Sequence, residues 1–271
     1  MNMTQDITNL YEKQGPYTEE DYLLFEEFRS KLEDGSIRAA EKNNGSWRTN
    51  IWVKKGILAG FRLGELTRMP WSDQKIFWDK NTFPERKITG IEGIRIVPGG
   101  SSVRCGAYIG KNVTIMPPSY VNVGAYIDDG TMLDSHCLVG SCAQVGKNVH
   151  ISAAAIIGGV LEPVGSNPVI VEDDSFIGGN CGIYEGVTIK SKAILAAGVV
   201  LTASTKVYDA VNKEFIFSSP EEILTIPERA VVVSGSRMLQ DHAGISLYCP
   251  VIIKYRDAKS DRSVTLEDWL R

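Results

Sequence analysis

Hydrophobic residues recur at every sixth position through the middle of the chain. Val, Ile or Leu occupies each of these positions from Val103 to Ile157, and the same spacing resumes from Val171 to Val207. A small or short side chain usually follows four places later. A period of six fits neither an α-helix, which repeats every 3.6 residues, nor a plain strand, which repeats every two. It fits strands that alternate with corners, so the sequence predicts a mainly β fold, a prism-shaped parallel β-helix.

The corners of this prism have a sequence pattern of their own. The position just before the small residue is Gly, Asn or Asp at nine corners: Gly106, Asn112, Gly124, Gly130, Asn148, Asp174, Asn180, Gly186 and Gly198. These residue types adopt a positive φ angle more readily than others. His136 falls in the same slot, where histidine is tolerated. We therefore expect positive φ angles at these positions.

The repeat is interrupted once. Between Ile157 and Val171 the spacing is fourteen residues instead of six, and the inserted stretch contains Gly158, Gly159, Pro163 and Pro168. Glycine and proline of this kind mark a loop, so we expect a loop over 158–170 that projects from one corner.

Outside the repeat, apolar residues at helical spacing predict helices over 18–34 and 50–63, with Lys54 and Lys55 on the solvent side of the second. Thr18 and Asp21 can cap the first helix. Residues 64–93 should form a small helical and extended cap over the open end of the prism.

Three regions result from this pattern. They are a mainly helical N-terminal cap domain over 1–97, the β-helix over 98–210, and a small β-rich extension over 211–271. In the extension, residues 231–235 and 251–254 have the composition of strands, and a short helix is expected over 265–271.

Composition narrows the possible functions. A net charge of −4 and an isoelectric point near 5.5 argue against nucleic-acid binding, because no basic stripe is available to neutralise phosphates. The five cysteines lack CxxC pairs, so we expect reduced thiols in a cytoplasmic protein. Neither a signal peptide nor an apolar run of membrane-spanning length is present, and we expect no membrane partner.

Asp134 is the strongest candidate for a chemical role. It follows the inward-facing Leu133, and Ser152 comes eighteen residues later, so the two should stack one strand spacing apart. A carboxylate there could accept a proton from an amine nucleophile or hold it in line. Arg95, just before the first coil, could bind a substrate carboxylate through two hydrogen bonds. The alternative for each is an ordinary solvated surface residue.

Other candidates have two interpretations each. His136 and His150 could serve as a base for acyl transfer or as metal ligands. With His242 they are the only histidines, and no pair has close ligand spacing, so we predict no metal site. Small residues could let a long cofactor arm lie against the coils, or could simply serve corners and packing: Gly178, Gly179, Ala196, Ala197 and Gly198.

The hexads resemble those of the hexapeptide-repeat acyltransferases, and a closer resemblance covers most of the chain. It is to the tetrahydrodipicolinate N-succinyltransferase family, an acyl-transfer family of lysine biosynthesis. The motifs that carry it are Ile37–Lys42, Trp52–Lys55, Arg95–Pro98, Pro118–Asn122, Gly130–Asp134, Val139–Gln144, Gly158–Pro163, Val233–Gly235 and Ser246–Cys249.

The resemblance implies a left-handed β-helix that forms a homotrimer, with sites between subunits and succinyl-CoA or acetyl-CoA as co-substrate. It places Arg95 and Asp134 on substrate-binding positions, with Asp134 meeting the amino group of a small amino dicarboxylic acid. The implied reaction is direct attack of that amine on the thioester, without an acyl-enzyme.

One coil departs from the family pattern. An arginine of the family is Asn180 here, an acidic residue thought to face the site is Gly182, and a tryptophan is His136. Losing charges of both signs alters what a pocket can hold, because an unpaired charge is costly to desolvate. The changes indicate a different acyl group or acceptor. One alternative is therefore a paralogue in a tabtoxin-type β-lactam pathway. An alternative of another class is a non-catalytic β-helical scaffold or binding protein.

Overall fold

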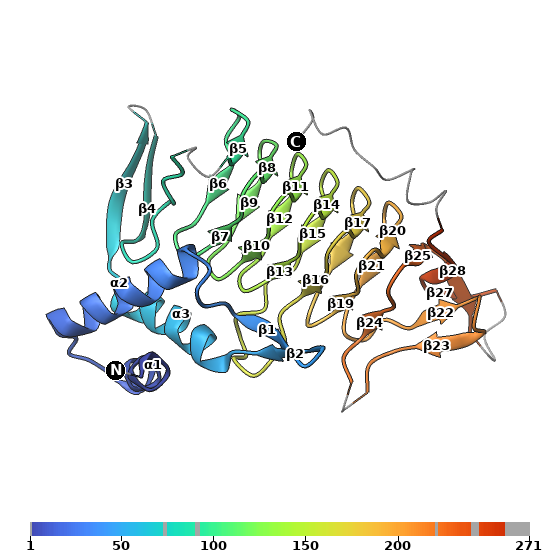
Figure 1. Ribbon diagram of the computed structural model, residues 1–271, viewed down its shortest axis with the longest axis horizontal. Helices are drawn as coiled ribbons and strands as arrows, with labels where there is room; N and C mark the ends of the chain where they lie inside the picture. The colour runs from blue at the N-terminus through green and yellow to red at the C-terminus, as the bar shows by residue number, and fades with distance from the viewer. Residues whose placement is uncertain (1, 73–74, 90–92, 220–221, 240–243, 258–271) are drawn as a thin grey trace.

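The computed structural model describes residues 2–72, 75–89, 93–219, 222–239 and 244–257. Figure 1 shows an elongated molecule, with helices at the N-terminal end, a stack of short strands in the middle and a small sheet at the C-terminal end. No helix within these described ranges is long and apolar enough to cross a membrane.

The central part is a left-handed parallel β-helix, as predicted, and its strands form three sheets. The first sheet contains β5 (Arg95–Ile96), β8 (Thr114–Ile115), β11 (Met132–Leu133), β14 (His150–Ile151), β17 (Phe176–Ile177), β20 (Ile194–Leu195) and β25 (Ala230–Val233). The second contains β6 (Ser102–Val103), β9 (Tyr120–Val121), β12 (Leu138–Val139), β15 (Ile156–Ile157), β18 (Gly182–Ile183) and β21 (Val200–Leu201). The third contains β7 (Tyr108–Ile109), β10 (Tyr126–Ile127), β13 (Gln144–Val145), β16 (Ile170–Val171), β19 (Thr188–Ile189) and β24 (Thr225–Ile226).

The hexads explain both the core and the corners. The aliphatic residue at each sixth position points inward and is no more than 3% exposed. All nine predicted corner residues have positive φ, from 52° at Asn148 to 83° at Gly106, and His136 has a φ of 65°. Cys142, Ala154 and Lys192 also have positive φ, at 67°, 59° and 62°, although their residue types do not favour it. The repeating geometry of the coil imposes this conformation even without a favourable residue.

The prism continues beyond the last hexad by a detour. Val207 begins β22 (Val207–Asp209), which leaves the coil and pairs with β23 (Glu214–Ile216) and β28 (Val251–Tyr255). The chain then returns, and β24 and β25 stack on β19 and β20. The strands expected at 231–235 and 251–254 are confirmed as β25 and β28. A hairpin of β26 (Ser236–Met238) and β27 (Ser246–Tyr248) follows β25, and the helix expected over 265–271 lies outside the described residues.

The N-terminal region has three helices. The predicted pair is confirmed as α2 (Glu19–Glu33) and α3 (Ile51–Leu63), whereas α1 (Met3–Glu12) was not foreseen. The backbone N–H of Thr18 donates to the Asp21 carboxylate at 2.7 Å, as a capping box requires. The segment after α3 forms an antiparallel hairpin, β3 (Leu66–Ser72) and β4 (Lys75–Lys80), without the expected helical part among its described residues.

Lys54 contradicts the expectation that it faces solvent. Its side chain is fully buried, and Nζ donates to the carbonyl oxygens of Pro163 at 3.2 Å and Ser166 at 2.8 Å. Both acceptors belong to the predicted loop over 158–170, which folds back against α3. Burial lowers the pKa of the Lys54 ammonium. The expectation was wrong because loop carbonyls, distant in sequence, replace the water around this side chain.

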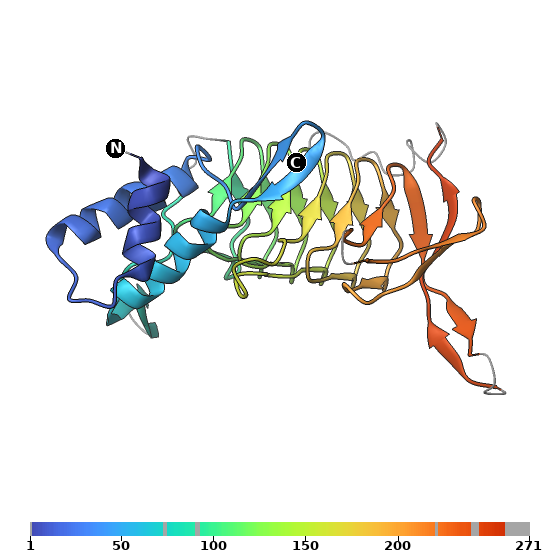
Figure 2. The same ribbon diagram turned by 90° about the horizontal axis from the view of Figure 1, so that it is seen from below.

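A second hairpin, β1 (Ala40–Asn43) and β2 (Ser46–Thr49), docks on the third sheet (Figures 1 and 2). The Arg38 guanidinium just before it lies 3.6 Å from the centroid of the Tyr126 ring and donates Nε to Gln144 Oε1 at 2.8 Å. The hairpin therefore covers part of the third sheet, around Gln144 and Glu172.

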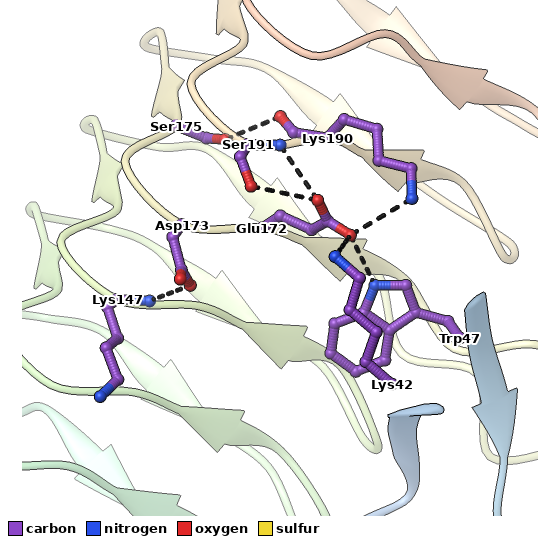
Figure 3. Close-up of polar contacts among 8 residues, drawn as sticks. All are labelled: Lys42, Trp47, Lys147, Glu172, Asp173, Ser175, Lys190 and Ser191. Carbon is purple, nitrogen blue, oxygen red and sulfur yellow. Dashed lines mark hydrogen bonds and ion pairs between the residues drawn. The ribbon is translucent and has the colours of Figure 1, made fainter. Parts of the chain in front are cut away.

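Glu172 fastens the hairpin to the prism (Figure 3). Its Oε1 accepts hydrogen bonds from Lys42 Nζ at 2.9 Å and Trp47 Nε1 at 2.8 Å, and Lys190 Nζ lies 3.3 Å away. Burial alone would raise the pKa of Glu172. The hydrogen bonds and the two ammonium charges outweigh burial and lower the pKa from 4.5 to about 2.

We expect Glu172→Gln to reduce the free energy of unfolding by about 1–3 kcal/mol at neutral pH, because charge-assisted hydrogen bonds are lost. The folded-state pKa lies below the unfolded one, so the wild-type advantage is complete above about pH 4.5. It should disappear as pH falls towards about 2. Denaturant titrations across this range measure the difference, with Glu41→Gln, an exposed change in the same hairpin, as control. A difference that stays constant with pH would contradict this assignment.

Candidate functional site

Most of the predicted site residues lie along one edge of the prism, where the first sheet turns into the second. Asp134, Ser152, Gly178 and Ala196 each follow directly after a strand of the first sheet. Backbone hydrogen bonds join them rung by rung, with Asp134 N donating to Ile151 O and Ser152 N to Ile177 O, both at 2.8 Å. We call these four residues, with the two that follow each of them, the corner ridge. Neighbouring rungs of a parallel sheet are about 4.8 Å apart.

Arg95 lies on the same sheet but away from the ridge. It is the first residue of β5, is exposed, and pairs through Thr114 with Met132 on β11. It is therefore two rungs before Asp134, roughly 10 Å along the prism. Gly178 is two rungs beyond Asp134 in the opposite direction. Asp134 thus stands between the position proposed for a substrate carboxylate and the small residues proposed for a cofactor arm.

One oxygen of the Asp134 carboxylate accepts a hydrogen bond from the backbone. Oδ1 accepts a hydrogen bond from Ser135 N at 2.7 Å, and the Asp134 carbonyl oxygen accepts one from Ser119 Oγ at 3.0 Å. Within the described part of the chain, Oδ2 has no hydrogen-bond partner. A half-buried carboxylate with a fixed backbone and one uncommitted oxygen can accept a hydrogen bond, or a proton, from an amine.

The three glycines of the ridge are subject to different structural constraints. A Cβ on Gly178 would lie 2.6 Å from Ala197 N and 2.7 Å from Leu195 O, so packing alone requires glycine there. Gly198 has a φ of +77°, which strains other residues. Gly179 is less constrained, since a Cβ would meet only Ala153 O at 3.3 Å, a tight contact that a small shift relieves. Gly179 is therefore the position whose small size the fold explains least.

His136 belongs to the corner ridge, and His150 lies on the strand that leads into it. His136 is exposed at the corner two residues after Asp134, and His150 stacks on Phe176 with ring centroids 4.8 Å apart. His242 lies outside the described residues. Among the residues that the structure describes, no three His, Cys, Asp or Glu side chains come together in a way that could hold a metal ion.

The cysteines are not suited to act as nucleophiles. All five are free thiols, and four of them are buried. Burial raises the pKa of Cys137, which lies beneath the Asp134 corner, to about 12, and that of Cys142 also to about 12. A thiol attacks as its thiolate, so these residues stay unreactive at neutral pH.

The coil that contains Gly182 has a packing contact that the sequence analysis did not predict. A Cβ on Gly182 would lie only 2.6 Å from Cε2 of Tyr184, so the tyrosine ring fills the space above this glycine. The sign was present in the sequence, because residues two apart in a strand point to the same face. Asn180 is exposed at its corner with a φ of 57°, which asparagine tolerates well.

Comparisons with known proteins identify the family of the chain. A family model for the tetrahydrodipicolinate N-succinyltransferase N-terminal region matches residues 2–63, and one for the hexapeptide repeat of succinyl-transferase matches residues 168–203. A crystal structure of a putative 2,3,4,5-tetrahydropyridine-2-carboxylate N-succinyltransferase from Campylobacter jejuni is 19% identical, with a TM-score of 0.47 over 86% of this chain and 63% of that chain. This structural likeness is too distant to carry an argument.

The sequence relatives are much closer. The 2,3,4,5-tetrahydropyridine-2,6-dicarboxylate N-succinyltransferase of Sodalis glossinidius is 42% identical over 249 residues, which cover 89% of this chain and 85% of the relative. The protein of the same name from Bradyrhizobium diazoefficiens is 43% identical over 248 residues, with 89% and 86% covered. The chain therefore belongs to the tetrahydrodipicolinate N-succinyltransferase family.

Proposed function

We propose that the protein is an acyl-CoA-dependent N-acyltransferase. It transfers a succinyl or acetyl group to the amino group of a tetrahydrodipicolinate-like amino dicarboxylic acid. The observation that carries the proposal is the corner ridge, on which a carboxylate with one uncommitted oxygen lies two rungs from a strip of small residues. The names of the relatives support the same reaction.

In the proposed reaction the amine nitrogen attacks the thioester carbonyl carbon directly. Asp134 orients the amine and accepts its proton as the C–N bond forms. The tetrahedral intermediate then collapses, the C–S bond breaks, and the CoA thiolate leaves and takes up a proton. Arg95 binds a carboxylate of the acceptor. Ser152, one rung beyond Asp134, forms a hydrogen bond with the acceptor. No acyl-enzyme is needed, in keeping with the buried, unreactive cysteines.

The donor arm is proposed to run along the small residues of the ridge. Gly178 and Gly179 form one step of this strip, and Ala196, Ala197 and Gly198 form the next. Gly178 is buried, whereas Ala197 and Gly198 are exposed, so a pantetheine arm can approach the backbone closely at these two residues. The side chains of Asn180 and Tyr184 near this strip are neutral. The choice between a succinyl and an acetyl donor is left to direct comparison of the two.

We propose that Asp134→Asn lowers kcat/KM for the acceptor by about 100-fold or more, because the amide cannot take the proton. The backbone contacts that hold the corner are unchanged, so thermal stability should stay near the wild-type value. Release of free thiol from succinyl-CoA or acetyl-CoA measures turnover. Asp174→Asn, at an exposed corner with φ of 57°, is the matched control and should retain activity. Equal activity of Asp134→Asn and wild type would exclude this role.

For Gly179→Leu we expect an intact fold but CoA binding weakened at least tenfold, because the new side chain occupies the proposed path of the arm. Calorimetric titration with CoA measures this directly. Gly178→Ala provides the contrast, since its Cβ would lie 2.6 Å from a backbone nitrogen and should destabilise the prism itself. If folded Gly179→Leu protein binds CoA as tightly as wild type, the donor arm does not lie along this strip.

A homotrimer with sites between subunits is part of the proposal, as is a cytoplasmic location, which free cysteines favour. The second sheet supports the assembly. Its outward residues include Tyr120 and Val200, which are 36% and 38% exposed, and the half-buried Leu138 and Ile156. An apolar strip of this kind on a rigid sheet is typical of a subunit interface.

Light scattering after size exclusion should therefore give three times the monomer mass at micromolar concentration. Ile156→Glu, at the middle of the strip, should shift this mass towards that of the monomer, because a buried unpaired carboxylate opposes association. A monomeric wild type would contradict the assembly.

A further inference from the structure

Tyr184 occupies a gap in the outward surface of the second sheet. The first residue of each strand there points outward: Ser102, Tyr120, Leu138, Ile156, Gly182 and Val200. Gly182 alone among these six lacks a side chain. The Tyr184 ring folds back over it, with Cε2, Oη and Cζ 2.6, 2.9 and 3.0 Å from where a Cβ would be. Cδ1 of the same ring lies 3.0 Å from the Cβ position of Gly158 on the preceding rung. Two glycines on adjacent rungs therefore form the bed on which the ring lies.

This packing directs the hydroxyl group towards the corner ridge. Gly182 begins β18, only four residues after Gly178, so the end of the strand under the Tyr184 hydroxyl is the end that meets the ridge. The half-buried ring is held against backbone on one side and cannot swing inward. Within the described part of the chain the hydroxyl makes no hydrogen bond. A rigidly held phenol with an unused donor thus borders the strip proposed for the donor arm.

We propose that Tyr184 is a specificity-determining residue whose hydroxyl donates a hydrogen bond to an oxygen of the donor's acyl group. The inference rests on the proposed function, because it takes the CoA arm to lie on the ridge. An arm on the strip at Gly178 and Gly179 brings its acyl end past the start of β18 on the way to Asp134. A hydroxyl fixed there distinguishes ligands that supply an acceptor from those that do not. The acceptor oxygen is either the thioester carbonyl or a terminal carboxylate.

The test compares the binding of CoA, acetyl-CoA and succinyl-CoA to the full-length wild type and to Tyr184→Phe, by calorimetry without acceptor. Phenylalanine keeps the ring on its glycine bed and removes only the oxygen. We expect the variant to bind acyl donors about tenfold more weakly, the effect of one hydrogen bond, and to bind CoA within twofold of wild type. A loss with both donors identifies the thioester carbonyl, and a loss with succinyl-CoA alone identifies the terminal carboxylate. Tyr208→Phe, on β22, is the control and should match wild type.

Gly182→Ala gives an independent variant, because its methyl group would lie 2.6 Å from the ring and must displace it. It should show the same selective loss of acyl-donor affinity. The inference is overturned if Tyr184→Phe binds the acyl donors as tightly as wild type, or if it weakens CoA by the same factor as the acyl donors. Turnover is assayed separately. If the wild type binds acyl-CoA but acylates no amine, the proposed reaction is refuted. The role of Tyr184 is then still decided by the binding measurements.

Discussion

The stacking of identical rungs is the constraint on which this structure depends. Each two-residue strand donates to and accepts from the strands one coil away, so the register between neighbouring coils is fixed at eighteen residues wherever no loop intervenes. One inward aliphatic residue per strand fills the prism, and one corner conformation repeats along each edge. A rung that slipped by one residue would turn its aliphatic side chain out of the core. The same strictness aligns Asp134 with Ser152 and, after the loop, with Gly178, on a line that no local sequence motif defines.

The N-terminal region packs on the third sheet of the prism and on the loop over 158–170. Glu172 and Gln144 project outward from the third sheet, where an uncovered prism would expose them to water. The hairpin covers them with Lys42, Trp47 and Arg38, and each polar group finds a partner. Lys54 performs a similar task at the loop, where two carbonyl oxygens bind its buried ammonium group. Both contacts are polar and largely buried, so each favours one docking geometry over others, because a misplaced partner would leave a charge unpaired. The ridge lies at the edge between the first and second sheets, away from these contacts on the third sheet.

Sequence alone predicted the parts of the fold that follow from short-range repetition. The hexads identified the prism, its corners and its single loop, and helical spacing identified α2 and α3. Helix α1 was missed although it is local, whereas two other misses share a physical cause. Lys54 looked solvent-exposed because its partners, Pro163 and Ser166, lie more than a hundred residues away. Val207 fitted the hexad spacing, yet its strand leaves the coil: Val207 pairs with Ile216 of β23, and Tyr208 pairs with Val251 of β28. For the candidate site, the alignment of Asp134 with Ser152 followed from the period of six. Which Asp134 oxygen is already hydrogen-bonded could be known only from the side-chain geometry.

The glycines show why residue type by itself could not separate structure from function on the ridge. Gly178 is required by a neighbouring backbone and Gly198 by its φ angle, whereas Gly182 makes room for the Tyr184 ring. Each is a glycine, but only its surroundings reveal which requirement it satisfies. The pair at 182 and 184 carries a further consequence, because neither residue can change freely without the other. Restoring a carboxylate at 182 would force the tyrosine ring off the sheet, and removing the ring would leave a hollow over two glycines. Gly182 and Tyr184 are therefore two halves of one packing arrangement, in which a neutral hydroxyl group lies over the start of β18.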